Sequence, residues 1–325
     1  MNKDKIKIVF FGTPDFAVAS LNAIVEKGYD IAAVVTATDK IAGRGHKLLC
    51  SAVKTYALEK NIPVLQPEKL KSEEFIIQLR EIDADLFVVI AFRMLPEVVW
   101  SMPRFGTFNL HASLLPKYRG AAPINRAVMA GETKTGVTTF FLQHEIDTGD
   151  IIDRVEIDIT PDDNAGSVHD KLMALGAELT VKTIDDICAG TLKTVPQEQL
   201  IEQGTQSCPA PKIFKETGNI DWQDCSENVH NLVRGLSPYP GAWTTLKSET
   251  SKPIEIKIFK TGLTDRKPQG DAGDVLIEND RMYINCSDFQ IEVLELQPAG
   301  KKRMDAASYM RGARLVGAKC VKENN

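Results

Sequence analysis

Three polar side chains in the middle of the chain have the types that acyl transfer to an amine requires. Asn109 and His111 stand two positions apart in a strand-like run, so their side chains share one face of a sheet. Asp147 follows in the loop-like stretch HEIDTGDI. Imidazole can carry the proton that an attacking amine loses, and an amide can donate a hydrogen bond to the oxyanion that forms. The carboxylate would orient the imidazole and favour its protonated form.

The same residues also have an ordinary structural explanation. An Asn-x-His at the end of a strand can complete a turn, and Asp-Thr-Gly-Asp can be a simple loop, so spacing alone leaves both explanations open. The sequence holds no GxSxG motif, so a covalent intermediate on the enzyme is not indicated. His144, His169 and His230 have no companions at metal-ligand spacing, and we expect no metal ion.

Strand-like and helix-like segments alternate through the first 190 residues. Short apolar runs indicate strands at 6–11, 31–36, 86–91 and 107–112, and helical patterns begin at Pro14 and cover 51–59 and 73–81. This alternation predicts an α/β domain with an open, mostly parallel, Rossmann-like sheet that has helices on both faces. The turn FGTPDF lacks the GxGxxG fingerprint, so NAD binding is not expected.

Polar motifs begin where the predicted strands end. They lie at residues 12–15, 91–93 and 109–116. Ligands of open α/β sheets bind at the carboxyl ends of the strands. We therefore expect the functional site at this edge of the sheet.

The alternation of strand-like and helix-like segments ends after residue 190. Residues 191–210 are polar, aperiodic and punctuated by proline, which indicates a surface linker. A helix opened by Ser226 then precedes five short strand-like runs separated by turn residues. We expect a catalytic domain at 1–190 and a small antiparallel OB-like β-barrel at 211–325, a type of barrel that often binds oligonucleotides.

The composition limits the classes of protein to which the chain can belong. Its 325 residues are 43% hydrophobic and 26% charged, which suits globular domains with buried cores. Six cysteines without CxxC spacing suggest thiols in a reducing compartment, and the N-terminus does not resemble a signal peptide, so we expect a cytoplasmic protein. The net charge of −5 argues against a general nucleic-acid binder, although residues 207–325 are relatively basic.

The stretch FNLHASLLPKYRGAAPINRA, with IDTGD further along, resembles the folate-dependent formyltransferases. That family shares an Asn-x-His motif, an SLLP-type turn and a distant aspartate, and all three occur here in the same order. The resemblance implies that Asn109 and His111 act on the formyl group of 10-formyltetrahydrofolate and that Asp147 supports His111. It also implies a folate site lined by Ser113, Leu114, Leu115 and Pro116.

A second part of the folate site is implied by position in the family. The loop that contains Ala91, Phe92 and Leu95 would cover the pterin ring. This chain has AFRMLP where many relatives carry a glycine-containing AYG…LP form. The pterin contacts of this loop therefore do not follow directly from the family pattern.

Further stretches resemble the branch of the family that formylates methionyl-tRNA. Residues 42–48, AGRGHKL, look like a basic loop that this branch inserts after the second strand, with Arg44 as the matching arginine, Lys47 close by and His46 in place of a lysine. The other explanation of this segment is a flexible surface loop. GAAPINRA has the form typical of the branch, and IDWQDCSENVHNLVRGLSPYPGAW and QPAGKKRM resemble parts of its C-terminal barrel domain.

Lys301, Lys302 and Arg303 form a run of three cations. On a barrel that meets RNA they would attract the phosphate backbone without reading the base sequence. Three consecutive cations are also common in a solvated turn. The sequence leaves both possibilities open.

Residues and resemblance together predict direct transfer of the formyl group from 10-formyltetrahydrofolate to the α-amine of methionyl initiator tRNA, by a monomer. A formyltransferase for an amino-sugar nucleotide is the main alternative. The enzyme that formylates glycinamide ribotide is disfavoured, because it needs neither the barrel nor the basic loop. A catalytically idle folate- or RNA-binding protein is a rival of another class, and the intact set of Asn109, His111 and Asp147 argues against it.

Overall fold

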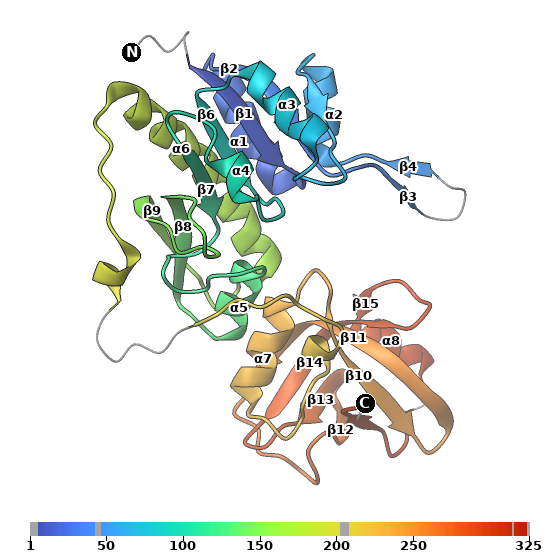
Figure 1. Ribbon diagram of the computed structural model, residues 1–325. Helices are drawn as coiled ribbons and strands as arrows, with labels where there is room; N and C mark the ends of the chain where they lie inside the picture. The colour runs from blue at the N-terminus through green and yellow to red at the C-terminus, as the bar shows by residue number, and fades with distance from the viewer. Residues whose placement is uncertain (1–5, 43–46, 202–207, 314, 324–325) are drawn as a thin grey trace. The chain divides into compact units, whose positions relative to one another are not determined.

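The computed structural model describes residues 6–42, 47–201, 208–313 and 315–323 (Figure 1). The chain divides into two compact units that are each built from several segments. The first unit consists of residues 1–123, 135–157 and 169–210, and the second of residues 124–134, 158–168 and 211–325.

The first unit is built around a seven-stranded sheet. Its strands are β1 (Lys7–Gly12), β2 (Asp30–Val35), β5 (Val64–Leu65), β6 (Leu86–Ile90), β7 (Thr107–His111), β8 (Lys134–Phe141) and β9 (Ile151–Asp158). They lie in the order β5-β2-β1-β6-β7-β8-β9. The first five of these pair in parallel, and β8 runs antiparallel to β7. The predicted mostly parallel sheet is confirmed.

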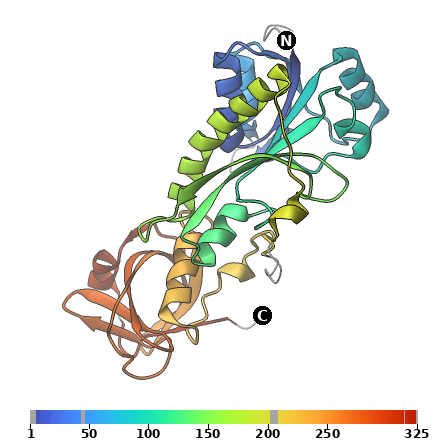
Figure 2. The ribbon, with the colours of Figure 1, turned by 90° about the vertical axis from the view of Figure 1, so that its left-hand side faces the viewer.

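Helices cover both faces of this sheet (Figure 2). They are α1 (Asp15–Glu26), α2 (Ala52–Glu59), α3 (Glu73–Ile82), α4 (Glu97–Trp100) and α6 (Ala165–Ala189). On one face, Phe11 and Val89 pack with Leu79 of α3 and Val99 of α4 in one buried apolar cluster. On the other face α6 approaches β7 so closely that a Cβ on Gly176 would stand 2.7 Å from a methyl carbon of Leu110.

The register of the sheet decides which face of β7 carries the side chains of Asn109 and His111, here called the polar pair. Phe11 of β1 is paired with Val89 of β6, and Val89 is paired with Asn109. Asn109 and His111 therefore belong to the face that carries Phe11 and Val89, while Leu110 points to α6. The apolar cluster fixes this face, because a shift of the strand by one residue would bury the polar pair against α6.

A two-stranded antiparallel ribbon follows β2. Its strands are β3 (Lys40–Ala42) and β4 (Lys47–Leu49), in which Lys40 pairs with Leu49 and Ala42 with Lys47. Ala42, Lys47 and Leu48 of the AGRGHKL stretch thus belong to this ribbon. Arg44 lies outside the described residues, and so does the side chain of Lys47.

Residues 191–201 and 208–210 form backbone contacts with other parts of the first unit. Val195 exchanges two backbone hydrogen bonds with Ile151, of 2.9 and 2.8 Å, and a 3-10 helix, η2 (Gln197–Leu200), follows. Ala210 then forms a parallel bridge with Gly120. Figure 1 shows residues 191–201 in yellow, descending beside β9 from the end of α6.

The second unit is built around an antiparallel sheet that curls into a small barrel. Its strands are β10 (Ala242–Ser248), β11 (Ser251–Leu263), β12 (Val275–Glu278), β13 (Arg281–Asn285), β14 (Gln290–Pro298), β15 (Met304–Asp305) and β16 (Lys319–Val321). The order is β12-β13-β14-β11-β10-β16, with β15 on β14. Backbone hydrogen bonds connect the first and last strands of this order, β12 and β16. The Val275 amide donates to the Ala318 carbonyl (2.9 Å), and the Cys320 amide donates to the Gly273 carbonyl (2.7 Å). The predicted small antiparallel barrel is confirmed.

Four short helical elements complete this unit: α5 (Pro123–Met129), η3 (Glu216–Gly218), α7 (Ser226–Gly235) and α8 (Ala306–Gly312). The barrel is filled by residues of its strands together with Val229 and Val233 of α7 and Tyr309 of α8. Trp222 lies in the same core, and its indole N–H donates to the Thr244 hydroxyl at 3.0 Å. Trp222 is therefore a core anchor.

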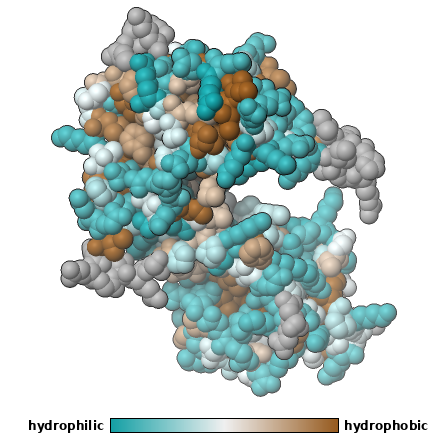
Figure 3. Space-filling model, in the orientation of Figure 1, coloured by the Kyte–Doolittle hydropathy of each residue, from teal (hydrophilic) through white to brown (hydrophobic). Residues whose placement is uncertain are grey.

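The described surface is mainly hydrophilic on the side that Figure 3 shows, and its apolar residues appear there as separate patches. Large exposed apolar side chains in the described part of the chain are scattered through both units, for example Met94, Ile146 and Val316. None of the helices that the structure describes is both long and apolar enough to cross a membrane.

Candidate active site

The polar pair lies at the carboxyl end of β7, where strand polarity and the sheet order predict a ligand site. Asn109 is half-buried and paired with Val89 on one side and with Phe140 on the other. Within the described part of the chain, its side-chain amide makes no hydrogen bond. Its donor group is therefore available to a ligand. His111 ends the strand and is buried, with 7% of its surface exposed.

His111 and Asp147 come together although 36 positions separate them in the sequence. The Nδ1 atom of His111 lies 3.8 Å from Oδ2 of Asp147, and the two side chains are 8% and 12% exposed. This distance exceeds that of a hydrogen bond, so the carboxylate acts on the ring as a nearby, poorly solvated negative charge. Asp147 thus lies beside His111, and Asn109 is on the same strand as His111, as the sequence predicts.

The other ring nitrogen of His111 has a fixed role. Its Nε2 lies 2.9 Å from the backbone carbonyl oxygen of Tyr118. A carbonyl oxygen only accepts hydrogen bonds, so Nε2 carries a proton. In the neutral imidazole Nδ1 then holds the lone pair, and no group of the described chain forms a hydrogen bond with it. Nδ1 is therefore the nitrogen that can exchange a proton with a substrate.

Asp147 is held in an unusual backbone conformation. Its φ of 56° lies in the left-handed region, which aspartate tolerates better than most residues. Its Oδ2 accepts a hydrogen bond of 2.9 Å from the backbone N–H of Gly120. Gly120 has a φ of 126° and lies so close to Ala210 that a Cβ would come within 2.6 Å of the Ala210 carbonyl oxygen. The carboxylate is thus aimed by a glycine that no larger residue can replace without strain.

The turn after β7 is tied to the neighbouring strands. The Ser113 hydroxyl donates to the Lys117 carbonyl (2.7 Å), and the Thr138 hydroxyl donates to the Ser113 carbonyl (2.6 Å). The Arg154 guanidinium donates to the Leu115 carbonyl at 2.9 Å. These bonds fix the course of the turn and hence the Tyr118 carbonyl that contacts His111.

The residues expected to line the folate site divide into two groups. Ser113 and Leu115 have no exposed surface, and Leu115 packs in an apolar cluster with Phe140 and Ile151. Their side chains therefore shape the turn from inside. Leu114 and Pro116 are half-buried and have surface to offer a ligand.

The loop expected over the pterin also contains both buried and exposed residues. Leu95 is 5% exposed and belongs to the apolar cluster under the sheet, and the Phe92 ring meets Phe11 edge-on at 5.7 Å between centroids. Ala91 is exposed and has a φ of 47°. Arg93 donates to the backbone carbonyls of residues 67 and 68, which anchors the middle of the loop.

The cations expected to meet RNA are not equivalent. Lys301 and Lys302 are exposed, and neither forms an ion pair within the described part of the chain. Arg303 is paired with Glu295, and its guanidinium stands over the Phe259 ring at 4.5 Å. Arg303 is therefore already engaged by the barrel, whereas the two lysines are open to a partner.

Two thiols of the barrel are unsuited to nucleophilic chemistry. Burial raises the pKa of Cys286 to about 12 and also raises the pKa of Cys320 well above its usual value. A thiolate is the reactive form, so both residues stay as neutral thiols. None of the six cysteines forms a disulfide, as the sequence suggests. The described residues contain no group of three or more His, Cys, Asp or Glu that could hold a metal ion.

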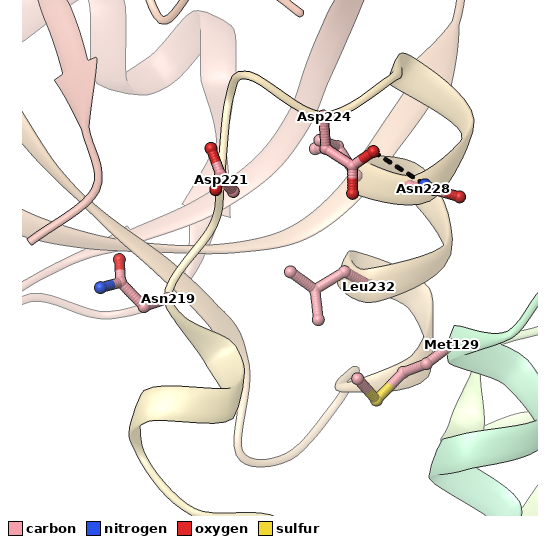
Figure 4. Close-up of a pocket in the computed structure, with 7 residues that line it drawn as sticks. Met129, Asn219, Asp221, Asp224, Asn228 and Leu232 are labelled. Atoms are coloured by element: carbon pink, nitrogen blue, oxygen red, sulfur yellow. Dashed lines mark hydrogen bonds between the residues drawn. The ribbon is translucent and has the colours of Figure 1, made fainter.

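A pocket of about 340 Å³ lies in the second unit (Figure 4). It is lined by Met129, Asn219, Asp221, Asp224, Asn228, Val229 and Leu232. Asp224 accepts a hydrogen bond from the Asn228 amide at 2.8 Å, and Asp221 accepts one from Lys322 at 2.8 Å. Because these carboxylates are already paired and no described lining residue is a histidine or a thiol, we place the chemistry in the first unit.

Gln197 is the residue of the site that the sequence did not reveal. It lies in the aperiodic segment after α6, has no exposed surface, and contacts both Arg119 and the Asp147 loop. Its only local signal is the preceding Pro196, the residue before the short helix that Gln197 begins. Nothing in that signal indicates a contact with a residue 50 positions earlier.

The site as a whole has the parts of a non-covalent acyl-transfer centre. It offers an unpaired amide donor, an imidazole with one free nitrogen, and a poorly solvated carboxylate. These groups stand at the carboxyl end of a strand in an open α/β sheet. Fold and site together define an enzyme that moves an acyl group.

Comparison with known proteins defines the group that is moved. The formyl transferase family model matches residues 5–184, and the model of the formyl transferase C-terminal domain matches residues 212–314. The chain belongs to the formyl transferase family. The two matched stretches contain the sheet with the candidate site and most of the barrel.

Individual relatives match over nearly the full length. The methionyl-tRNA formyltransferase of Bacteroides fragilis is 51% identical over 98% of both chains. That of Bacteroides thetaiotaomicron is 53% identical over 97% of this chain and 98% of the relative. A solved structure of the sugar 3N-formyl transferase WlaRD, in the presence of dTDP and 5-N-formyl-THF, has a TM-score of 0.64 over 91% of this chain and 99% of its own, at 23% identity. At that identity the likeness supports the fold alone.

Proposed function

We propose that the protein transfers the formyl group of 10-formyltetrahydrofolate to the α-amine of the methionine carried by initiator tRNA. The family and the two full-length relatives named for methionyl-tRNA support this function. The observation that carries it is the meeting of Asn109, His111 and Asp147, with 3.8 Å between imidazole and carboxylate. The product, N-formylmethionyl-tRNA, serves translation initiation, which fits a cytoplasmic enzyme.

The reaction begins with attack of the neutral amine on the formyl carbon. A carbon–nitrogen bond forms, and the carbonyl electrons move to oxygen. The Asn109 amide donates a hydrogen bond to this oxyanion, and the positive charge of protonated His111 stabilises it. The bond between the tetrahedral carbon and N10 of the folate then breaks, and N10 takes a proton from Nδ1 of protonated His111. The attacking nitrogen gives its surplus proton back to Nδ1, so the ring ends as it began. No covalent bond to the enzyme is needed.

The surroundings of His111 assign the path of the proton. Nε2 is occupied by the Tyr118 carbonyl, so the proton is exchanged at Nδ1. The nearby Asp147 carboxylate stabilises positive charge on the ring, and the gap of 3.8 Å leaves Nδ1 free of a tight hydrogen bond. A proton can therefore move between Nδ1 and substrate without breaking the contact that holds the ring.

The two substrates would contact different parts of the chain. Residues 113–116 and 91–95 would hold the folate, with Leu114, Pro116 and Ala91 offering surface to it. Arg44, which lies between β3 and β4 in the sequence, and Lys47 of β4 would contact the tRNA. Lys301 and Lys302 on the barrel would attract its phosphates. In this assignment residues 1–190 perform the chemistry and residues 211–325 bind RNA, within a monomer.

A formylation assay with purified substrates tests the function. His111→Ala and Asn109→Ala should each lower kcat by about 100-fold or more, because each removes a group that acts on the developing charge. His144→Ala, at an exposed histidine, is the control that should retain wild-type turnover. Near-normal formylation of methionyl-tRNA by either site variant would contradict the assignment, and activity on an amino-sugar nucleotide instead would replace the acceptor.

A further inference from the structure

Gln197 is fully buried, and every hydrogen-bonding group of its side chain has a partner. Its Nε2 donates to the backbone carbonyls of Asp147 (2.9 Å) and Gly149 (2.8 Å). Its Oε1 accepts from Nε (3.0 Å) and Nη2 (2.6 Å) of Arg119. A glutamine is seldom buried completely unless all its polar atoms are satisfied, and here two donors and two acceptor positions are all used.

These bonds hold the backbone of the Asp147 loop. The left-handed backbone of Asp147 persists only where surrounding contacts fix it. Its carboxylate is held by the N–H of Gly120, while its own carbonyl is held by Gln197. The residue is thus pinned at both ends, which sets the direction of the carboxylate toward His111.

The segment that contains Gln197 also touches the other contact of His111. The Tyr118 amide donates to the Cys208 carbonyl at 2.6 Å, and the Ala210 amide donates to the Arg119 carbonyl at 2.7 Å. The Tyr118 carbonyl is the group that holds Nε2 of His111. The segment after α6 therefore supports both neighbours of the imidazole, and Gln197 joins them through Arg119.

We infer that Gln197 is a positioning residue for formyl transfer. Through the Asp147 backbone carbonyl, its amide helps to fix the Asp147 carboxylate at 3.8 Å from Nδ1 of His111. Gln197 lies between the two stretches matched by the family models, 5–184 and 212–314. The inference rests on the proposed function, since it assigns Gln197 a role through Asp147 rather than contact with the reacting atoms.

Two substitutions at Gln197 separate its hydrogen bonds with Arg119 from its hydrogen bonds with the Asp147 loop. Gln197→Met keeps the length of the side chain and removes all four hydrogen bonds. Gln197→Glu keeps an acceptor for Arg119 and removes only the donors to the Asp147 loop. Both should lower kcat by about tenfold or more with KM for each substrate within about threefold of wild type, because a misplaced catalytic group costs rate rather than binding. Both should also change the pH profile of kcat.

Gln199→Met is the matched control. It lies on the same short helix but is exposed, and its side chain forms no hydrogen bond within the described part of the chain. Its turnover and pH profile should equal those of the wild type. Thermal unfolding of every variant gives the fraction folded, and Gln197→Glu allows the test if Gln197→Met does not fold.

A double-mutant cycle with Asp147→Asn decides whether Gln197 acts through Asp147. If it does, adding Gln197→Glu to Asp147→Asn lowers kcat by no more than about twofold further, because the group being positioned is already disabled. A full additional tenfold loss in the double variant would overturn the inference. Wild-type kcat and pH profile in folded Gln197→Glu would also overturn it.

The same assays distinguish failure of this inference from failure of the proposed function. Asp147→Asn and His111→Ala test the function directly. If they keep activity, the catalytic assignment itself is wrong. If they lose activity while the Gln197 variants keep it, only the positioning role is wrong.

Discussion

The candidate catalytic centre and the candidate RNA-contacting turn of the barrel are built in opposite ways. Around Asp147 and His111 the polar groups are poorly exposed and are held by backbone groups from distant segments. At residues 301–303 the cations are exposed, and the two lysines have no ion-pair partner in the described chain. Stabilising a charge that develops at one atom requires fixed dipoles, whereas attraction to a phosphate backbone requires only net charge near a surface. Precise geometry is therefore concentrated in the first region.

The largest loss of turnover is expected for the isosteric substitution Asp147→Asn in the catalytic centre. The amide keeps an oxygen for the Gly120 N–H and tolerates the left-handed backbone, but the negative charge beside His111 is lost. We expect kcat to fall by about 100-fold, with a melting temperature close to wild type. Asp150→Asn, in the same loop, is the control and should keep its activity. Equal turnover in the two variants would show that the carboxylate of Asp147 has no electrostatic role.

Gly120→Ala should damage stability and turnover together. A Cβ there would lie 2.6 Å from the Ala210 carbonyl oxygen, at a φ of 126°. Strain of this kind costs roughly 1–3 kcal/mol, and relief would move the N–H that aims Asp147. The measurements are chemical denaturation and kcat.

Gly300→Ala provides the matched control for Gly120→Ala. Gly300 also has a positive φ, of 76°, but nothing lies within 4 Å of its added Cβ. It should lose some stability and keep its kcat. If Gly120→Ala kept normal kcat as well, the N–H of Gly120 would not be needed to aim the carboxylate.

Some residues of the site could be predicted from a local sequence pattern, and others could not. Asn109 and His111 were accessible from sequence, because a strand places alternate residues on one face whatever surrounds it. The strands of 86–90 and 7–12 were accessible too, since parallel strands buried on both faces are continuous apolar runs. Local pattern was enough for these.

The supports of the site depend on contacts between residues far apart in the chain. Gln197 lies in a polar stretch that looks like a linker, and its role arises only when the chain returns to Asp147. The left-handed backbone of Asp147 and the close approach of Gly120 to Ala210 likewise have no periodic signal. In the barrel, β15, α8 and β16 were missed because two- to seven-residue elements are too short to show a period.

Changes at the RNA-contacting turn should be smaller and should depend on salt. Lys301→Ala combined with Lys302→Ala should weaken methionyl-tRNA binding a few-fold and reduce the slope of log K against log salt by about 1–2, since up to two phosphate contacts are lost. Arg303→Ala should change that slope little and instead lower stability, because Arg303 is paired with Glu295 and stacked on Phe259. Equal slope changes from Arg303 and the lysines would show that Arg303 leaves Glu295 to meet the RNA.

The smallest predicted effect concerns the pH dependence of the barrel's stability. Burial, with a contribution from the nearby Arg234 charge, lowers the pKa of His230 below its usual value, and its Nδ1 lies 2.9 Å from the Thr261 hydroxyl. The folded state then binds fewer protons than the unfolded state, so stability is full above the unfolded pKa of about 6.5 and declines as the pH falls below it. His230→Gln keeps a polar group near Thr261 but cannot titrate, so its free energy of unfolding should change less between pH 7 and pH 5, as measured by denaturant titration at each pH. An unaltered pH dependence in His230→Gln would show that His230 is protonated to the same extent in the folded and unfolded chain.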